Sequence, residues 1–307
     1  MSRFARVALT WGGIFGLVFG GMAFTPPAAA EDAPTYQLRF KFAPQQELFY
    51  VTQNDTEFLV EHGETKQTIP HTSMNIRRIQ VLSVNPDGSA HVELVIDRAR
   101  MTAQNAGVDS LYDSMDPEHI PTEFDKVHQS IGKAVPAILT PRGKVLPTKN
   151  SPANVEQNDL MFQLPEQPLA VGGTWKDNFE ASVQIDAESK LFRQIKLQRR
   201  YELKSVENGI ATISLLTVPL TPLNNPFQES QLVQRKPIGT LKFDIKNGCL
   251  IDRQFQINEQ VIGHAGPGSA ITVRVIKVDR LVNVDQLKQV DLTKPLVPVR
   301  VAARPTP

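Results

Sequence analysis

The sequence predicts a mainly β protein made of two duplicated antiparallel curved sheets, arranged as a sandwich or half-barrel-like, with one short helical insert in the first copy. Three observations lead to this fold class. Apolar and polar residues alternate along many segments, turn-forming residues recur at short intervals, and a segment of the first half is echoed in the second. Strands joined by tight turns pair antiparallel and need no crossover helices.

The alternation is clearest in three segments. Residues 241–245 place Leu, Phe and Ile on one face, and residues 92–96 and 271–275 repeat the pattern with Val, Leu and Ile. Successive side chains of a strand point to opposite faces of a sheet, so each segment has one face suited to a core. Turn residues separate such segments at 85–88, 141–143, 208–209, 247–248 and 263–269.

Two similar segments, called the echoing segments below, occur in the two halves of the chain. Residues 77–94 read RRIQVLSVNPDGSAHVEL and residues 199–216 read RRYELKSVENGIATISLL, each with two arginines, a strand-like run, a Ser-Val, a turn and a second run. Such self-similarity indicates an internal repeat. We therefore expect these regions: a signal peptide at 1–30, a first β repeat at 31–150 with its helical insert at about 108–133, a Pro-rich junction at 151–170, a second β repeat at 171–284 and a Pro-rich tail at 285–307.

The insert of the first copy predicts a short helix. Thr122 can cap it, Gly132 can end it, and Phe124, Val127 and Ile131 fall on one face. Such a helix either covers an open end of the sheet or lies inside a concave sheet as a lid on an apolar cavity. The candidate ligand-binding residues of the second alternative are Phe124, Val127, Ile131 and Trp175.

The insert also holds the densest cluster of ionisable residues. Glu118, His119, Asp125 and His128 are the candidate metal ligands, and Asp125 and His128 are close enough in sequence to share a helix face. Their spacing matches no zinc or calcium motif. If the four side chains converged, a hydrolase-like enzyme built on this insert would be the corresponding function.

Other catalytic signatures are missing from the sequence. Ser269 lacks the flanking residues of a nucleophile elbow, Gly143-Lys144 is not followed by Ser or Thr, and no HExxH pair occurs. We therefore expect no catalytic residue, no cofactor and no enzymatic activity. Cys249 is the only cysteine, so an intrachain disulfide is impossible, and its place at the start of an apolar strand predicts a small buried side chain.

The first thirty residues predict a removed signal peptide. Arg3 and Arg6 precede an apolar run over 7–23, and Ala28 to Ala30 supply small residues before a cleavage at Glu31. The run is also about long enough for an uncleaved membrane anchor. We expect an exported, periplasmic or extracellular protein without a stable membrane span once the signal is removed, with N-terminal anchoring as the alternative.

The charge balance excludes nucleic acid as a partner. Removal of residues 1–30 changes the formal net charge from +1 to −1, because two arginines and no acidic residues are lost. Nucleic-acid binding requires a concentrated basic excess. The one basic run, residues 193–200, alternates between two strand faces, and we expect it to be a solvated edge strand.

Four short segments resemble a family of uncharacterised exported bacterial proteins. Its members have a signal peptide, a Tyr-Asp-Ser segment, a Val-Gly-x-x-Trp junction opening the second half, and a Phe-Asp strand before a Gly turn. The corresponding segments here are Val171 to Trp175, Tyr112 to Ser114, Pro141 to Val145 and Gly239 to Asp244. Gly173 departs from a position that is commonly acidic. The resemblance implies the same fold across the mature chain and carries no activity or functional residue.

The function that the sequence favours is an exported, non-catalytic binding or scaffold protein of the bacterial cell envelope. Its partner would be an envelope protein, a glycan or an apolar ligand. A more specific alternative is a periplasmic carrier of an apolar, lipid-like ligand, which requires a sheet interior that is apolar and not filled by side chains.

Overall fold

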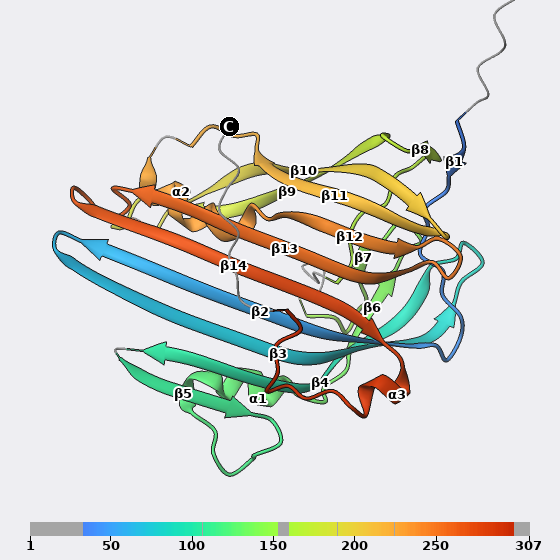
Figure 1. The fold of residues 1–307 in the computed structure, drawn as a ribbon, viewed down its shortest axis with the longest axis horizontal. Coiled ribbons are helices and arrows are strands. Elements are labelled where there is room, and N and C mark those ends of the chain that lie inside the picture. The colour runs from blue at the N-terminus through green and yellow to red at the C-terminus, as the bar shows by residue number, and fades with distance from the viewer. Residues whose placement is uncertain (1–32, 106, 153–159, 189, 224, 298–307) are drawn as a thin grey trace, which may run out of the picture. The chain divides into compact units, whose positions relative to one another are not determined.

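The computed structural model describes residues 33–105, 107–152, 160–188, 190–223 and 225–297 (Figure 1). The predicted signal peptide lies outside the described residues, as do residues 153–159 of the junction and 298–307 of the tail. The chain divides into two units, Met1–Ala33 and Pro34–Pro307, and the fold is that of the second unit.

Within the described residues, one large sheet holds most of the strands in the order β7-β6-β4-β3-β2-β14-β13-β12-β11-β10-β9, with β5 paired to β4. All of its pairs are antiparallel, and a small sheet pairs β1 with β8. The strands of the first half are β1 (Thr35–Tyr36), β2 (Glu47–His62), β3 (Thr65–Val84), β4 (Ala90–Asn105), β5 (Val108–Asp113), β6 (Val135–Leu139) and β7 (Val145–Pro147). Those of the second half are β8 (Leu169–Ala170), β9 (Thr174–Gln184), β10 (Phe192–Glu207), β11 (Ile210–Pro219), β12 (Ile238–Asp244), β13 (Cys249–Ile262) and β14 (Ser269–Val282).

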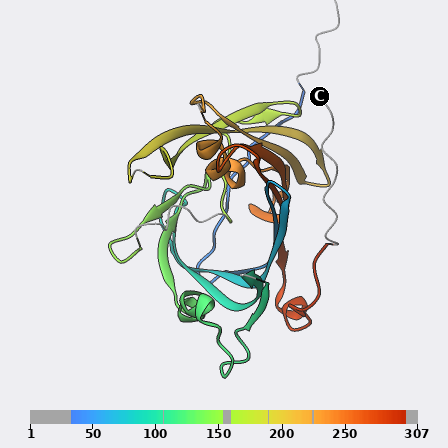
Figure 2. The ribbon, with the colours of Figure 1, turned by 90° about the vertical axis from the view of Figure 1, so that its left-hand side faces the viewer.

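The large sheet curls around an interior, so that it has a concave and a convex face (Figure 2). The mainly β, antiparallel, curved fold predicted from the sequence is confirmed. The strands of the two halves are joined edge to edge, because β2 pairs with β14 from His62 opposite Ser269 to Phe49 opposite Val282. This junction of β2 and β14 is the seam of the sheet.

The two echoing segments each form a hairpin, β3–β4 and β10–β11. Asn208 and Gly209 have φ values of 52° and 78°, the double positive φ of a tight hairpin turn that Asn-Gly favours. The duplication itself stays a prediction. Strand β10 lies between β9 and β11, so the expectation that residues 193–200 form an edge strand was wrong.

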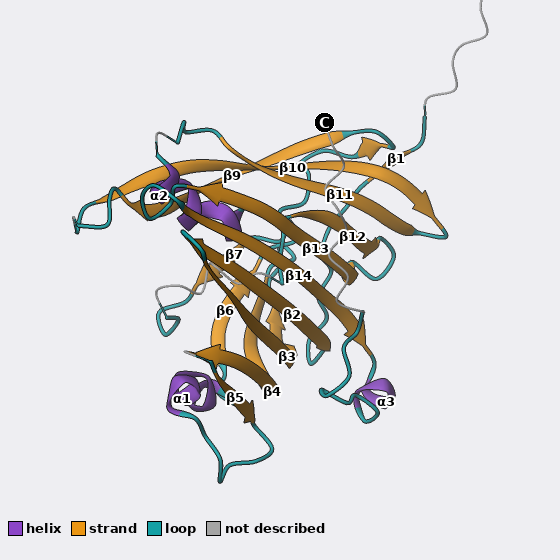
Figure 3. Cartoon of the chain, turned by 60° about the vertical axis from the view of Figure 1, so that its left-hand side comes forward, coloured by secondary structure: helices purple, strands orange, loops and turns teal. Residues whose placement is uncertain are grey.

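Short helices follow the central hairpin of each half (Figure 3). The predicted helix is present as a 3-10 turn, η1 (Thr122–Phe124), followed by α1 (Asp125–Ser130), although Thr122 makes no capping hydrogen bond. A second helix, α2 (Pro226–Leu232), and its 3-10 extension η3 (Val233–Arg235) were not predicted. No helix in the described part of the chain is long and apolar enough to cross a membrane.

The sequence at the start of α2 explains why a helix forms there. The Asn225 side chain accepts a hydrogen bond from the Gln228 amide at 2.8 Å, and Pro226 occupies the first helical turn. Asn at the N-cap and Pro at the first position are the preferred helix-starting pair. The capping signal was therefore present in the sequence, inside a segment that reads as loop.

The chain after β14 covers part of the convex face. Helix α3 (Val284–Leu287) begins this segment, and Leu292 is buried against Val51 and Ile76. The backbone amide of Val297 donates to the Gln53 side chain at 3.1 Å. Residues 284–297 thus pack on the outer side of the seam.

We expect Gly143→Ala to be strongly destabilising. Gly143 has a φ of +81°, and a Cβ atom there would lie 2.0 Å from the carbonyl oxygen of Phe162. Positive φ costs an L-residue about 1–2 kcal/mol, and the clash also displaces a buried segment, so we expect a total loss above about 3 kcal/mol. Urea denaturation measures this loss.

Gly172→Ala is the matched control, since Gly172 has a φ of +86° with nothing within 4 Å of the added Cβ. It should lose only the positive-φ cost of about 1–2 kcal/mol. Equal losses in the two variants would contradict the close packing of residues 143 and 162.

Candidate ligand-binding cavity

The strand register places one continuous row of side chains across the concave face. Directly opposed residues of an antiparallel pair lie on the same face of the sheet. Each neighbour in the following row is such a pair, from β5 to β9: Tyr112, Met101, Ser73, Asn54, Lys277, Phe255, Gly239, Leu215, Tyr201 and Trp175. Other concave residues follow from the cross-strand pairs in the same way, with a change of count at the register shifts in the β3–β4, β10–β11 and β12–β13 pairs.

One end of the concave interior is filled by a large apolar core. Phe162 packs against Phe40 and Phe243, with ring centroids 5.6 and 6.2 Å apart. The Phe40 amide donates to Pro141 and the Lys41 amide donates to Gly248, so the segment before β2 bridges turns of both halves. Segments 38–42 and 160–164 therefore plug this end of the curved sheet.

The other end of the concave interior is covered by α2 and η3. Leu232 is buried with Ile195 and Leu197 of β10, and Val233 with Ile257 and Val275 of β13 and β14. The ribbon shows α2 on the inner side of these strands (Figure 2). An amphipathic turn thus caps the interior from the side opposite to the plug.

A cavity of about 530 Å³ lies between the plug and the α2 cap. Exposed side chains of Lys144, Gln234 and Arg235 line it, so the cavity reaches the protein surface there. The remaining lining residues come mostly from β2, β9, β10, β13, β14 and the plug: Asn54, Thr56, Gly143, Val145, Met161, Phe162, Gln163, Asp177, Asn178, Phe179, Arg199, Tyr201, Leu215, Pro237, Phe255, Gln256, Ile257, Val275, Arg253 and Lys277.

A buried ion pair beside the cavity joins β13 to β14, and a threonine of β2 binds the same carboxylate. Asp279 of β14 and Arg253 of β13 are 0% and 2% exposed, and Arg253 Nε donates to Asp279 Oδ2 at 2.7 Å while Nη2 binds the same oxygen. The other carboxylate oxygen accepts from Thr52 of β2 at 2.7 Å. Both oxygens of the buried carboxylate are therefore satisfied, as buried charges require.

Two further basic side chains surround this carboxylate. Burial alone would raise the pKa of Asp279, but Arg253, Lys277 and Arg77 together outweigh burial and hold that pKa below its usual value. Burial lowers the pKa of Lys277 to about 8, with Asp279 opposing and Arg77 adding to the shift. The centre of the concave face thus holds three basic groups around one acid.

A second ion pair lies on the β9–β10 side of the cavity. Arg199 Nη1 contacts Asp177 Oδ2 at 3.1 Å, and the guanidinium stacks over Phe179 at 4.2 Å from the ring centroid. Arg77 and Arg199 are the first arginines of the two echoing segments, and their partners Tyr50 and Asp177 place both on the concave face. The echo therefore contributes one inward arginine from each half.

Tyr201 lines the cavity and carries a buried hydroxyl group. Its side chain is 2% exposed, and the hydroxyl makes no hydrogen bond of normal geometry with the described residues, with the Arg199 side chain as a polar neighbour. Burial raises the pKa of Tyr201, although Arg199 acts in the opposite direction, so the phenol stays protonated.

The predicted ligand-binding residues of the insert lie on the concave face but do not line this cavity. Phe124 is buried against Tyr112 and Ala99, with Val127 and Ile131 partly buried around it. They cover the concave face at β4 and β5, so α1 covers an end of the sheet. None of the three residues lines this cavity, so the lid alternative stays a prediction that this cavity does not support.

Trp175 also lies outside the cavity wall. Its ring stacks on Tyr201 at 5.1 Å between centroids, and its indole Nε1 donates to the Gln163 carbonyl at 2.7 Å. Both contacts are to lining residues, so Trp175 packs beside the cavity wall without lining it.

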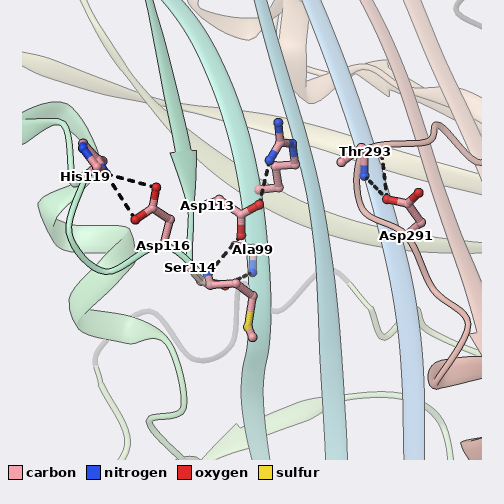
Figure 4. A network of polar contacts seen from close by, with 9 residues as sticks. Ala99, Asp113, Ser114, Asp116, His119, Asp291 and Thr293 are labelled. Atoms are coloured by element: carbon pink, nitrogen blue, oxygen red, sulfur yellow. Dashed lines mark hydrogen bonds and ion pairs between the residues drawn. The ribbon is translucent and has the colours of Figure 1, made fainter.

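Two of the four candidate metal ligands, His119 and His128, contact different residues. His119 Nδ1 lies 3.1 Å from Asp116, a local contact seen in Figure 4, and His128 Nδ1 lies 3.3 Å from the Tyr112 hydroxyl. Among the described residues, no three His, Cys, Asp or Glu side chains are grouped to hold a metal ion. Glu118, His119, Asp125 and His128 therefore do not form the site proposed for them.

Cys249 is buried, as predicted, and burial raises the pKa of its thiol to about 11. A thiol with such a pKa is protonated at neutral pH and is a poor nucleophile. Cys249 thus contributes to packing.

Sequence reasoning missed Arg253, Lys277 and Asp279. A signal for them exists in β14, where the inward positions 271, 273 and 275 are apolar and the inward positions 277 and 279 are Lys and Asp. A charged residue that continues an apolar strand face has to be paired or to border a ligand site.

Comparisons with known proteins assign no family. No family model matches the sequence, and no curated protein matches it. A solved structure of lipovitellin, concerned with lipid–protein interactions, is 10% identical over 79% of this chain and 26% of that chain, with a TM-score of 0.43. The match thus spans about a quarter of the lipovitellin chain.

A structure of DynF, from the dynemicin biosynthesis pathway of Micromonospora chersina, is 8% identical over 86% of this chain and 96% of that chain, with a TM-score of 0.20. Neither similarity supports a functional assignment. The resemblance to uncharacterised exported proteins stays a prediction.

We expect Asp279→Asn to cost about 3–5 kcal/mol in urea denaturation, because it leaves a buried guanidinium without its counter-ion. Asp285→Asn is the control: Asp285 pairs with Lys288 at 3.1 Å and its side chain is 88% exposed. That variant should stay within about 0.5 kcal/mol of the parent. An Asp279→Asn variant as stable as the control would contradict the role of the buried pair.

We expect Lys277 to make stability rise with pH between about 8 and 10.5. Its folded-state pKa of about 8 lies below the ordinary 10.5, so in this window the unfolded chain holds a proton that the folded chain has released. The unfolding free energy then increases with pH, by at most on the order of 3 kcal/mol.

Comparison with Lys277→Met isolates this effect, because Cys249 and the tyrosines titrate equally in both proteins. The stability of the parent minus that of the variant should grow from pH 8 to pH 10.5. A constant difference would show that Lys277 titrates normally.

Proposed function

We propose that this chain is an exported, non-catalytic binding protein of the bacterial cell envelope that holds an apolar ligand in the concave face of its sheet. The observation that carries the proposal is the cavity of about 530 Å³ between the plug and the α2 cap. Its volume is within the range of small-molecule sites, about 300–1,000 Å³.

The composition of the wall supports an apolar ligand. Phe179, Leu215, Phe255, Ile257 and Val275 present apolar surface to the cavity. A few polar groups lie among them, which is the usual make-up of a site that binds a mainly apolar molecule and fixes its orientation.

The way the interior is filled also supports a binding role. Residues 160–164 fill one end and α2 covers the other, yet no described side chain occupies the space between them. Well-packed cores leave few voids larger than a water molecule, so a space of this size that opens to the surface is available to a ligand.

Export and the absence of catalysis are parts of the proposal that rest on the sequence. The signal-like segment at 1–30 supports export, and the absence of catalytic motifs from the sequence supports a non-catalytic role. His119 and His128 contact different residues, which gives the hydrolase alternative no added support. A scaffold that acts only through its surface is the competing function, and it predicts no ligand in the cavity.

Native mass spectrometry of the chain, expressed with its own N-terminal segment and purified from an exporting bacterium, tests the proposal. We expect a bound apolar mass that denaturing solvent releases. Loading the protein with a neutral apolar dye, N-phenyl-1-naphthylamine, gives a second readout through fluorescence. A bare polypeptide that also fails to bind the dye would refute the carrier and favour the surface scaffold.

We expect Leu215→Trp to reduce dye binding by at least about tenfold, because the indole fills cavity volume. Leu215 lines the cavity and is 5% exposed. Leu216→Trp is the matched control, since Leu216 is the next residue on β11, is 45% exposed and lies on the opposite face. Thermal unfolding of both variants separates lost binding from lost folding. Equal binding by the two variants would contradict a site in this cavity.

A further inference from the structure

The charges that line the cavity are unbalanced. Lys144, Arg199, Arg235, Arg253 and Lys277 are basic, whereas Asp177 is the acidic residue among the described lining positions. Asp177 pairs with Arg199 at 3.1 Å, and Asp279 beside the cavity pairs with Arg253. Basic groups still outnumber acidic ones around the cavity, and a concave low-dielectric site concentrates the resulting positive field.

A further basic residue, Arg77, lies close to the cavity without lining it. Arg77 acts on both Asp279 and Lys277 from β3, so three basic groups share the Asp279 carboxylate. An additional negative charge at Lys277 would oppose the burial that disfavours its charged form. The seam is thus arranged to accept an anion at the cavity wall.

The positions of the cations and the apolar side chains give the ligand an orientation. Lys277 of β14 lies opposite Phe255 of β13, and the Arg253 guanidinium lies 5.0 Å from the centroid of the Phe255 ring. Two residues along β14 from Lys277 is Val275, which belongs to the apolar cluster under η3. Two residues of a strand span about 6.8 Å. The cations therefore border apolar surface that continues under η3.

We infer that the ligand is an amphiphilic anion, with a carboxylate or phosphate group on Arg253 and Lys277 and an apolar chain against Ile257, Val275 and Phe179. This inference rests on the proposed carrier function and specifies its ligand class. The carboxylate and phosphate alternatives share the same chemistry, a negatively charged oxygen group at one end of an apolar chain.

Isothermal titration of the full chain with dodecanoate, dodecyl phosphate and dodecanol tests the inference. The three probes have the same apolar chain and differ only in the end group. We expect one or both anions to bind at least about tenfold more tightly than the alcohol. The stronger anion identifies the end group.

Two variants locate the charged group. Lys277→Met should abolish most of the anion preference, measured as the ratio of anion to dodecanol affinity, whereas Lys242→Met, a change at an exposed residue of β12, should leave that ratio as in the parent. The preference of the parent should also fall as pH rises above about 8, since Lys277 then loses its proton while Asp279 stays ionised. The variant should lack this pH dependence.

The outcomes separate the two proposals. Equal binding of anions and alcohol overturns the anion site while N-phenyl-1-naphthylamine binding upholds the carrier. An anion preference that survives Lys277→Met overturns the placement at the seam. If the dye and all three amphiphiles fail to bind, the carrier function itself is refuted.

Discussion

The ion pair of Arg253 and Asp279 is the constraint on which the arrangement of the sheet depends. It lies at the seam where β2 joins β14, and Thr52 ties the same carboxylate to the first half of the chain. A register shift of one residue would turn Asp279 to the convex face. Because a buried carboxylate without its partners is very costly, the pair specifies a single register for the two halves.

The seam also explains how one curved sheet can have a packed core and a cavity. Apolar residues fill the concave side up to Tyr50, whose hydroxyl donates to the Leu250 carbonyl at 3.0 Å, and then the charged band of Arg77, Arg253 and Asp279 begins. Charged side chains cannot be packed against an apolar plug without loss of solvation. The plug therefore stops at the band, and the space beyond it is the cavity.

The strand framework was predictable from residues that carry local information. The alternation at 241–245 and 271–275 and the Asn208-Gly209 turn led to strands and hairpins that the structure contains. Helix α2 was missed because its capping residues lie in a short segment with no long apolar period. The edge prediction for β10 failed because the position of a strand in a sheet depends on partners distant in sequence.

The cavity residues were missed for the same physical reason. Lys277 and Arg253 are ordinary alternating residues of their strands, and only pairing across the seam brings them together with Arg77. The metal site was predicted in the insert because its charged residues are close in sequence. In the structure His119 contacts Asp116, and Asp113 contacts Arg100. Density of ionisable groups along the chain was a poor guide to density in space.

The seam has a consequence for how the molecule is assembled during synthesis. Thr52 and Asp279 are 227 residues apart, and β14 is the last described strand of the sheet, so almost the whole chain must emerge before β2 finds its second neighbour. Until then the edge of β2 that faces away from β3 is unpaired, a surface on which strands of other chains can add. Copies that fold close together are therefore exposed to strand exchange at this edge until β14 closes it.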